Sequence, residues 1–199
     1  WRRDPAVPVR MVEGLGNPGQ RYRHTRHNVG FMVAAEILER ARCGPDRMRD
    51  EALTAPAKIG EQEIVVVQPQ TFMNLSGVAV AALARRGGID PSEILLVYDD
   101  ADLPLGVIRI RQGGSPAGHR GVTSVVQTLG TRDVPRVRLG IGKDPGDLAE
   151  RVLSPFGRAE MPQVERMIKD AADAVEAVLS KGLIAAMNEY NRRVVPAEN

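Results

Sequence analysis

The sequence predicts a single α/β domain, built on one mixed and twisted β-sheet with helices on both faces. Two apolar runs, residues 64–67 and 94–97, have the continuous hydrophobicity of strands that are buried on both faces. Patterns of helical periodicity lie before, between and after these runs. The length of 199 residues suits one core, and no repeat or linker tract divides the chain.

The first half of the chain alternates strands with helices. Residues 11–12 form a short strand that enters a glycine- and proline-containing loop at 14–19. Apolar residues at i, i+3, i+4 and i+7 from Phe31 to Leu38 predict a helix, with Asn28 as its N-cap and Gly44-Pro45 as its stop. The next expected elements are strands at 53–59 and 63–68, a polar turn at 71–77 and a helix at 78–86.

The second half begins with the strand at 94–97, which ends in an acidic cluster, Asp99, Asp100 and Asp102. Apolar and basic residues alternate in 107–111 and again in 136–138, so the arginines of each strand share one face. The remaining expected elements are a loop at 112–121, a helix at 122–129, an apolar helical stripe from 164 to 179 and a last helix from Leu183 to about Tyr190.

We expect the domain to span residues 11–193. Residues 1–10 are expected to be a disordered tail or one added for expression, and residues 194–199 a C-terminal tail. No apolar run approaches the roughly 20 residues that a membrane span needs. The single cysteine, Cys43, excludes an internal disulfide framework and CxxC motifs, which suits a reducing cytoplasm.

Positive charge is concentrated in one part of the chain. The formal net charge is only +2, but residues 107–143 hold seven Arg or Lys against one acid, Asp133. Such a concentration suits a polyanionic partner, although an ordinary solvated face has the same composition.

The loop at 14–19 matches G-x-G-x-x-G and follows a strand, as in dinucleotide-binding proteins. In those proteins the loop opens directly into a helix that holds the pyrophosphate. Here residues 20–27 are polar and basic, and the apolar helix begins only near Asn28. The sequence therefore argues against a nicotinamide-dependent enzyme.

Several polar side chains suit hydrolysis by activated water. A neutral imidazole can take a proton from water, a carboxylate can fix its tautomer, and carboxamide N–H groups can stabilise an oxyanion. An alternative is a zinc site formed by His24, His27 and an aspartate, although a spacing of three in a loop is a weak signal. The candidates are His24, His27, His119, Asp99, Asp100, Asp102, Asn17, Asn28 and Asn74.

The motifs, taken in order, resemble those of the bacterial peptidyl-tRNA hydrolase family, and the resemblance covers about residues 11–190. The matching segments are Gly14-Leu15-Gly16-Asn17-Pro18-Gly19, Tyr22, Thr25-Arg26-His27-Asn28-Val29-Gly30, Thr71-Phe72-Met73-Asn74-Leu75-Ser76-Gly77, Asp99-Asp100-Ala101-Asp102-Leu103-Pro104-Leu105-Gly106, Gly118-His119-Arg120-Gly121 and Arg138-Leu139-Gly140-Ile141-Gly142. Several motifs in one order are far more specific than any one of them.

The resemblance implies a monomeric, cytoplasmic esterase without metal or cofactor, which frees tRNA for reuse in translation. Its partner would be peptidyl-tRNA, bound at the acceptor arm and the 3′ end. It implies that His27 is the general base and that Asp99 orients it. It also implies that Asn17 and Asn74 hold the carbonyl and the water, with Asn74 the donor to the oxyanion.

The resemblance also implies binding residues. Tyr22 and Met73 would line the groove for the peptide and the terminal adenosine, and the loop at 113–121 would form its opposite rim. The remaining residues with implied binding roles are His119 and Arg120 for the substrate, and Arg111 and Arg138 for tRNA phosphates, to which the strand pattern adds Arg109 and Arg136.

Three positions depart from the family pattern. Arg120 stands where Asn is common, and its guanidinium only donates hydrogen bonds. Pro116 stiffens a loop that is usually rich in glycine, and Glu13 ends a strand where an apolar residue is usual. The alternative function is a non-catalytic RNA-binding relative of the same fold.

Overall fold

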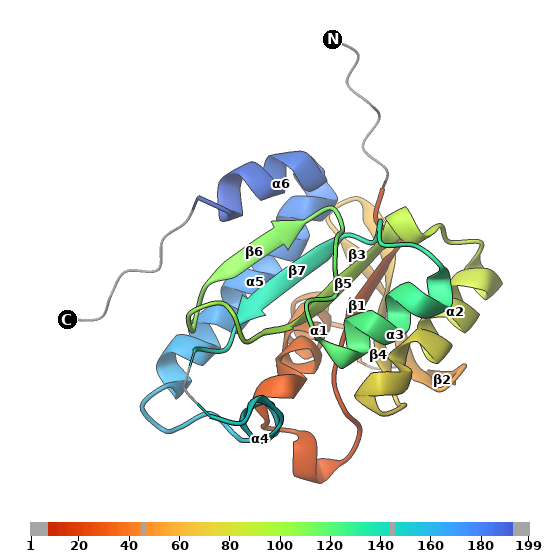
Figure 1. Cartoon of the computed structure of the whole chain (residues 1–199). Helices are drawn as coiled ribbons and strands as arrows, with labels where there is room; N and C mark the ends of the chain where they lie inside the picture. Colours follow the sequence, from red (N-terminus) through yellow and green to blue (C-terminus); the bar gives the residue numbers. More distant parts are fainter. Residues whose placement is uncertain (1–7, 45–46, 144–145, 193–199) are drawn as a thin grey trace.

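The computed structural model describes residues 8–44, 47–143 and 146–192. One mixed sheet runs through the described chain in the order β2-β3-β4-β1-β5-β7-β6 (Figure 1). Strands β4, β1, β5 and β7 are parallel, and the remaining neighbours are antiparallel. The strands are β1 (Met11–Gly14), β2 (Arg47–Arg49), β3 (Ala52–Ile59), β4 (Gln62–Pro69), β5 (Ile94–Asp100), β6 (Ile108–Arg111) and β7 (Arg136–Gly140).

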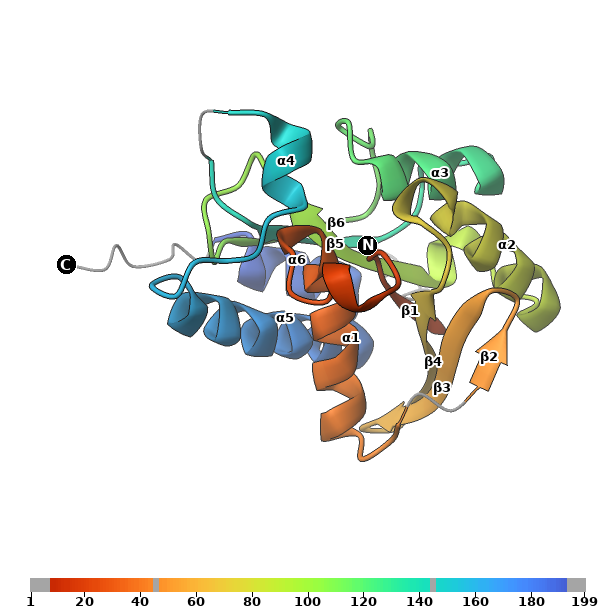
Figure 2. The ribbon, with the colours of Figure 1, turned by 90° about the horizontal axis from the view of Figure 1, so that it is seen from below.

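Helices cover both faces of the sheet (Figure 2). One face packs on α1 (Val29–Arg40), α5 (Met161–Lys181) and α6 (Leu183–Tyr190), and the other on α2 (Ser76–Gly87) and α3 (Arg120–Leu129). A short helix, α4 (Leu148–Val152), lies near the carboxyl ends of the strands and contacts the turn at residues 26–28 (Figure 1). The short 3₁₀ turns are η1 (Gln20–Tyr22), η2 (Arg26–Asn28), η3 (Met73–Leu75) and η4 (Pro91–Glu93).

The predicted fold class is confirmed. Strand β2 and helix α4 were missing from the prediction, and α3 begins at Arg120 rather than at residue 122. Val9 is buried and the Arg10 main chain bonds to Glu93 and Val65, so packing starts before residue 11. Residues 1–7 of the tail expected at 1–10, and the tail expected at 194–199, lie outside the described residues. No helix in the described part of the chain is both long and apolar enough to cross a membrane.

Helix α1 approaches the sheet closely at Gly30. A Cβ atom there would lie 2.4 Å from the Val97 carbonyl oxygen and 2.5 Å from that of Leu15. Only glycine permits this contact. It sets the first turn of α1 against the end of β1 and the middle of β5, which brings the preceding turn, η2, next to the carboxyl end of β5.

A buried carboxyl group lies in the central strand. Glu13 is fully buried on the α2 side of β1, between Val67 and Leu96 of the neighbouring strands. Among the described residues neither of its oxygens has a hydrogen-bond partner. Burial raises the pKa of Glu13 well above its ordinary value, so the group is held in its neutral form.

This burial predicts a stability that falls as the pH rises. The unfolded chain ionises freely above the ordinary pKa of a glutamate, whereas the folded chain ionises only above the raised pKa. We expect Glu13→Gln to remove this pH dependence, and Glu13→Met also to raise the free energy of unfolding at neutral pH by about 1–3 kcal/mol. Urea unfolding at several pH values measures both effects, and equal slopes for wild type and Glu13→Gln would contradict the assignment.

Candidate active site

A cavity of about 810 Å³ lies at the carboxyl ends of the central strands. Its floor is formed by residues that end or follow β1, β4 and β5, namely Asn17, Met73 and Asp99. The loop at 113–118 and helix α4 line it from two sides, and Figure 2 shows these two segments standing apart above the sheet.

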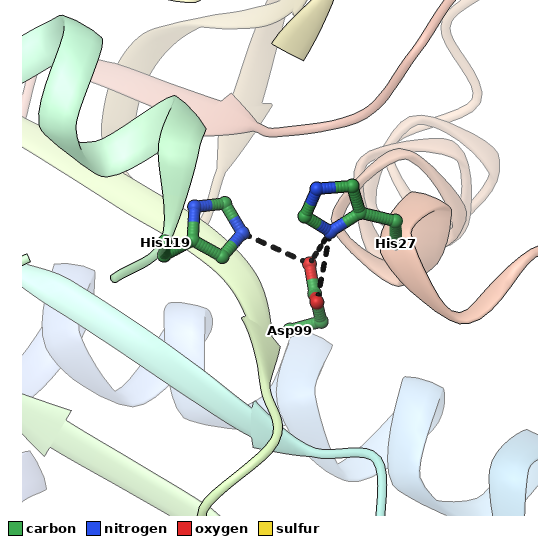
Figure 3. Close-up of side chains that lie close together, drawn as sticks. All are labelled: His27, Asp99 and His119. Carbon is green, nitrogen blue, oxygen red and sulfur yellow. Dashed lines mark hydrogen bonds and ion pairs between the residues drawn. The ribbon is translucent and has the colours of Figure 1, made fainter. Parts of the chain in front are cut away.

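His27, Asp99 and His119 meet in this cavity (Figure 3). Nδ1 of His27 lies 2.8 Å and 2.9 Å from the two carboxylate oxygens of Asp99. Nε2 of His119 lies 3.0 Å from Oδ1 of the same carboxylate. Within the described residues no hydrogen bond involves Nε2 of His27, and His27 lines the cavity. One carboxylate therefore joins two imidazoles, and one imidazole keeps a free nitrogen.

The hydrogen bonds fix the tautomer of each imidazole. The main-chain N–H of Val122 donates to Nδ1 of His119 at 3.2 Å, so this nitrogen carries no proton. The N–H at Nε2 of His119 donates to Asp99. Asp99 likewise accepts the Nδ1–H of His27, which leaves Nε2 of His27 with a lone pair.

Asp99 is an anion in this setting. Its burial by itself raises the pKa, but the interactions with His119 and His27 outweigh burial and hold the pKa of Asp99 well below its ordinary range. The Tyr98 ring packs against His119 at 4.8 Å between centroids, and the His27 ring does so at 4.9 Å. These contacts restrict the orientation of His119.

The same three residues bear on the alternative of a metal site. One ligand atom from each of His27, Asp99 and His119 lies within 4.8 Å of the others, which is close enough to surround a cation. Binding there would displace both imidazole protons, and His119 would have to protonate Nδ1 and lose the bond from Val122. His24, the other residue of the zinc alternative, is exposed and lines a different hollow. The hydrogen bonds favour proton transfer over metal ligation.

Asn17 and Asn74 line the cavity together with His27. Oδ1 of Asn17 accepts the N–H of Met73 at 2.8 Å, so the amide N–H groups of Asn17 point elsewhere. Asn28 holds the main chain of Asn17 through two bonds of 2.9 Å. Asn28 begins α1 as predicted, but its side chain makes these bonds and does not cap the helix. Asn74 follows Met73 in η3 and lines the cavity.

A buried arginine fixes the turn that carries His27. Arg26 bonds to both oxygens of Glu160, at 2.9 Å and 2.8 Å, and its guanidinium lies 4.6 Å from the centroid of the Phe156 ring. The bond to Arg26 holds the pKa of Glu160 below its ordinary value despite partial burial. η2 is thereby attached to the segment that precedes α5.

The predicted substrate-binding residues all line the cavity: Tyr22, Met73, His119 and Arg120. Tyr22 is half-buried, with the Arg21 guanidinium 4.5 Å from its ring centroid. Met73 is also part of the core under α3, because a Cβ atom on Gly121 would lie 2.4 Å from its sulfur. Arg120 is exposed on the rim.

The four arginines of β6 and β7 share one side of the sheet, as predicted, but their environments differ. Arg109 lies opposite Arg138, and Arg111 opposite Arg136. Arg111 is exposed and lines the cavity, whereas Arg138 is partly buried and bonds to Asp100. Arg109 is half-buried and bonds to the Ile108 carbonyl. Arg136 is only 2% exposed, which corrects the expectation that it faces solvent.

Sequence reasoning missed the wall that α4 contributes. Leu148, Val152 and Leu153 line the cavity opposite the loop at 113–118. Asp147 caps α4 by accepting the N–H groups of Ala149 and Glu150. The signal was available, because an aspartate followed three residues later by a glutamate is typical of a helix start.

A carboxylate-oriented imidazole, adjacent amide donors and a basic rim are typical of hydrolases that activate water. The sequence model of the peptidyl-tRNA hydrolase family matches residues 11–198. The chain is 44% identical over 183 residues to a peptidyl-tRNA hydrolase of Syntrophomonas wolfei, covering 92% of this chain and 100% of that protein. It is 47% identical over 184 residues to that of Chloroflexus aggregans, covering 91% and 98%.

Solved structures agree with the sequence comparisons. The crystal structure of peptidyl-tRNA hydrolase from Acinetobacter baumannii superposes with a TM-score of 0.89 at 27% identity, covering 96% of this chain and 98% of that one. The chain belongs to the peptidyl-tRNA hydrolase family.

Proposed function

We propose that this protein hydrolyses the ester bond between a peptide, or an N-blocked amino acid, and the 3′-terminal ribose of tRNA. The observation that carries the proposal is the His27–Asp99 pair, which leaves Nε2 of His27 free in a large cavity. Family membership supplies the substrate class.

His27 acts as the general base. Its Nε2 takes a proton from water, and the resulting hydroxide adds to the ester carbonyl carbon while the C=O electron pair moves onto oxygen. The tetrahedral intermediate then re-forms the C=O bond and breaks the bond to the ribose oxygen. That oxygen takes the proton back from His27. Asp99 stabilises the imidazolium between these two steps and fixes its orientation.

Asn17 and Asn74 serve the carbonyl and the water. Because Oδ1 of Asn17 accepts the N–H of Met73, the amide N–H groups of Asn17 are left to bind the substrate. The same bond holds η3, which carries Asn74, next to the loop after β1, which carries Asn17, and both residues line the cavity. We assign the oxyanion to Asn74, with Asn17 holding the carbonyl region. Preorganised donors of this kind stabilise charge without reorientation.

His119 has a different role from the one expected. Both of its ring nitrogens are engaged, by Asp99 and by Val122, so it positions Asp99 rather than the substrate. Tyr22, Met73 and Arg120 remain the proposed contacts for the peptide and the terminal adenosine. Pro116 and Arg120 lie on the rim that this substrate would meet.

The tRNA phosphates lie over the arginine face of β6 and β7. Like charges directly opposite one another on neighbouring strands are destabilising, and this face carries two such pairs. A polyanion bound there would relieve the repulsion. We assign the phosphate contacts to Arg111 and Arg138, while Arg109 remains a predicted contact.

Arg111 offers the cleaner test of this face, because removing Arg138 would also leave Asp100 without its ion pair. We expect Arg111→Met to weaken tRNA binding and to lower the slope of log Kd against log salt by about 0.7–0.9, the value for one phosphate contact. A salt titration of tRNA binding measures this slope. An unchanged slope would remove Arg111 from the interface.

The remaining parts of the proposal follow from family membership. We propose a monomeric, cytoplasmic enzyme that needs no metal or cofactor, with residues 11–193 as its functional domain. The test is release of an N-acetyl-aminoacyl group from tRNA, with unblocked aminoacyl-tRNA as the control and a chelator in every reaction. Cleavage of the blocked substrate alone supports the proposal. Salt-sensitive tRNA binding without cleavage would favour the non-catalytic RNA-binding alternative.

A further inference from the structure

The loop at 112–119 joins β6 to α3 and forms one side of the cavity. The loop approaches residue 132 closely, since the N–H of Gly114 donates to the Arg132 carbonyl at 3.1 Å. A Cβ atom on Gly113 would lie 2.4 Å from the same oxygen. The loop ends in a turn in which the N–H of His119 donates to the Pro116 carbonyl. The position of the loop therefore decides where His119 enters α3.

The Arg136 side chain lies beneath this loop. Nη1 donates to the Ser115 carbonyl at 2.7 Å, Nη2 donates to the Gly114 carbonyl, and Nε donates to the Val134 carbonyl at 3.3 Å. Burial raises the pKa of Tyr98, whose ring packs on His119, and the positive charge of Arg136 opposes this shift. A guanidinium that is 2% exposed and bonded to main-chain carbonyls is directed at the protein, not at a solvent-borne anion.

We infer that Arg136 is a positioning residue that holds the loop at 112–119 in place, and that it makes no contact with tRNA phosphates. The planar fork of a guanidinium offers donors on two separate nitrogens to two adjacent carbonyls, a geometry that the single nitrogen of a lysine ammonium does not reproduce. The register supplies a matched comparison. Arg111 lies directly opposite Arg136 on β6, carries the same charge, and is exposed.

Two measurements on Arg136→Met, with Arg111→Met as the control, distinguish a residue that positions the loop from one that contacts phosphates. Hydrogen exchange of the amides at 113–119 should accelerate about tenfold or more in Arg136→Met and stay unchanged in Arg111→Met. The slope of log Kd for tRNA against log salt should stay at the wild-type value in Arg136→Met and fall in Arg111→Met. Wild-type exchange together with a shallower slope in Arg136→Met would overturn the inference.

Arg136→Lys keeps the charge and covers the case in which Arg136→Met fails to fold. A phosphate contact tolerates lysine, so both readouts would then stay near wild type and the inference would fail. A residue that positions the loop does not tolerate lysine, so hydrogen exchange of the amides at 113–119 should accelerate while the salt slope of tRNA binding stays at the wild-type value.

Two of the three readouts rest on the proposed function: the salt slope, which needs tRNA binding, and a fall in kcat/KM of about tenfold for Arg136→Met. If no variant of this chain hydrolysed peptidyl-tRNA, the proposed function would fail, whereas the exchange result would still decide the role of Arg136.

Discussion

His27→Ala should lower kcat for N-acetyl-aminoacyl-tRNA by about 10²–10⁴-fold, the contribution expected of a general base. The variant loses the only imidazole nitrogen of the His27–Asp99–His119 cluster that makes no hydrogen bond within the described residues. His119 cannot replace it, because one of its nitrogens bonds to Val122 and the other to Asp99. Single-turnover rates with enzyme in excess measure the chemical step directly.

The affinity for tRNA supplies the control for this variant. His27 lies on η2, whereas the arginines assigned to the tRNA phosphates lie on β6 and β7. We therefore expect His27→Ala to bind tRNA with nearly wild-type Kd and salt dependence. A variant that cleaves at a near-normal rate would show that His27 is not the base. One that loses tRNA binding as well would point to a disturbed fold.

Asp99→Asn should lower kcat by on the order of 10²-fold or more. Most of this loss should come from weaker stabilisation of the His27 imidazolium. The carboxylate accepts N–H groups from both His27 and His119, whereas a carboxamide has one oxygen and directs its own N–H groups at one of them. The substitution therefore disturbs the tautomer of at least one imidazole. Single-turnover rates at neutral pH measure this loss.

The lowered pKa of Asp99 adds a stability effect with a defined sign. Its contribution to the free energy of unfolding is present above the ordinary aspartate pKa and is lost as the pH falls through the lowered value. Asp99→Asn should therefore lose this part of the acid dependence. Asp102→Asn, which removes a nearby exposed carboxylate, is the matched control and should leave the dependence of stability on pH unchanged. Identical profiles for both variants would contradict the pairing of Asp99 with His27.

The sequence sufficed for the architecture and for most of the residues in the cavity. The apolar runs at 64–67 and 94–97 became the buried strands β4 and β5, because only strands covered on both faces have such continuous hydrophobicity. The last helix was predicted from Leu183 to about Tyr190 and has those bounds. Motif order placed His27, Asp99, Asn17 and Asn74, and the structure brings all four to one cavity.

Hydrogen bonds between residues far apart in the sequence could not be predicted from the sequence. The alternation in 136–138 assigned Arg136 to a face of the sheet, but it could not show that the loop at 113–118 covers that side chain. The family resemblance assigned His119 to the substrate, and the sequence could not show its bonds to Asp99 and Val122, which depend on where α3 begins. Asn28 likewise had the local pattern of a helix cap, yet its side chain bonds to Asn17.

A single-turnover reaction in water enriched in ¹⁸O tests the central claim most directly. Enzyme in excess over N-acetyl-aminoacyl-tRNA, with chelator present, is quenched at times shorter than one turnover. Attack by water activated at His27 predicts free acid with one ¹⁸O in its carboxylate, released together with intact tRNA, and no acyl group on the protein at any time. An acyl-protein that forms before the free acid, or bound tRNA that stays esterified, would contradict the mechanism.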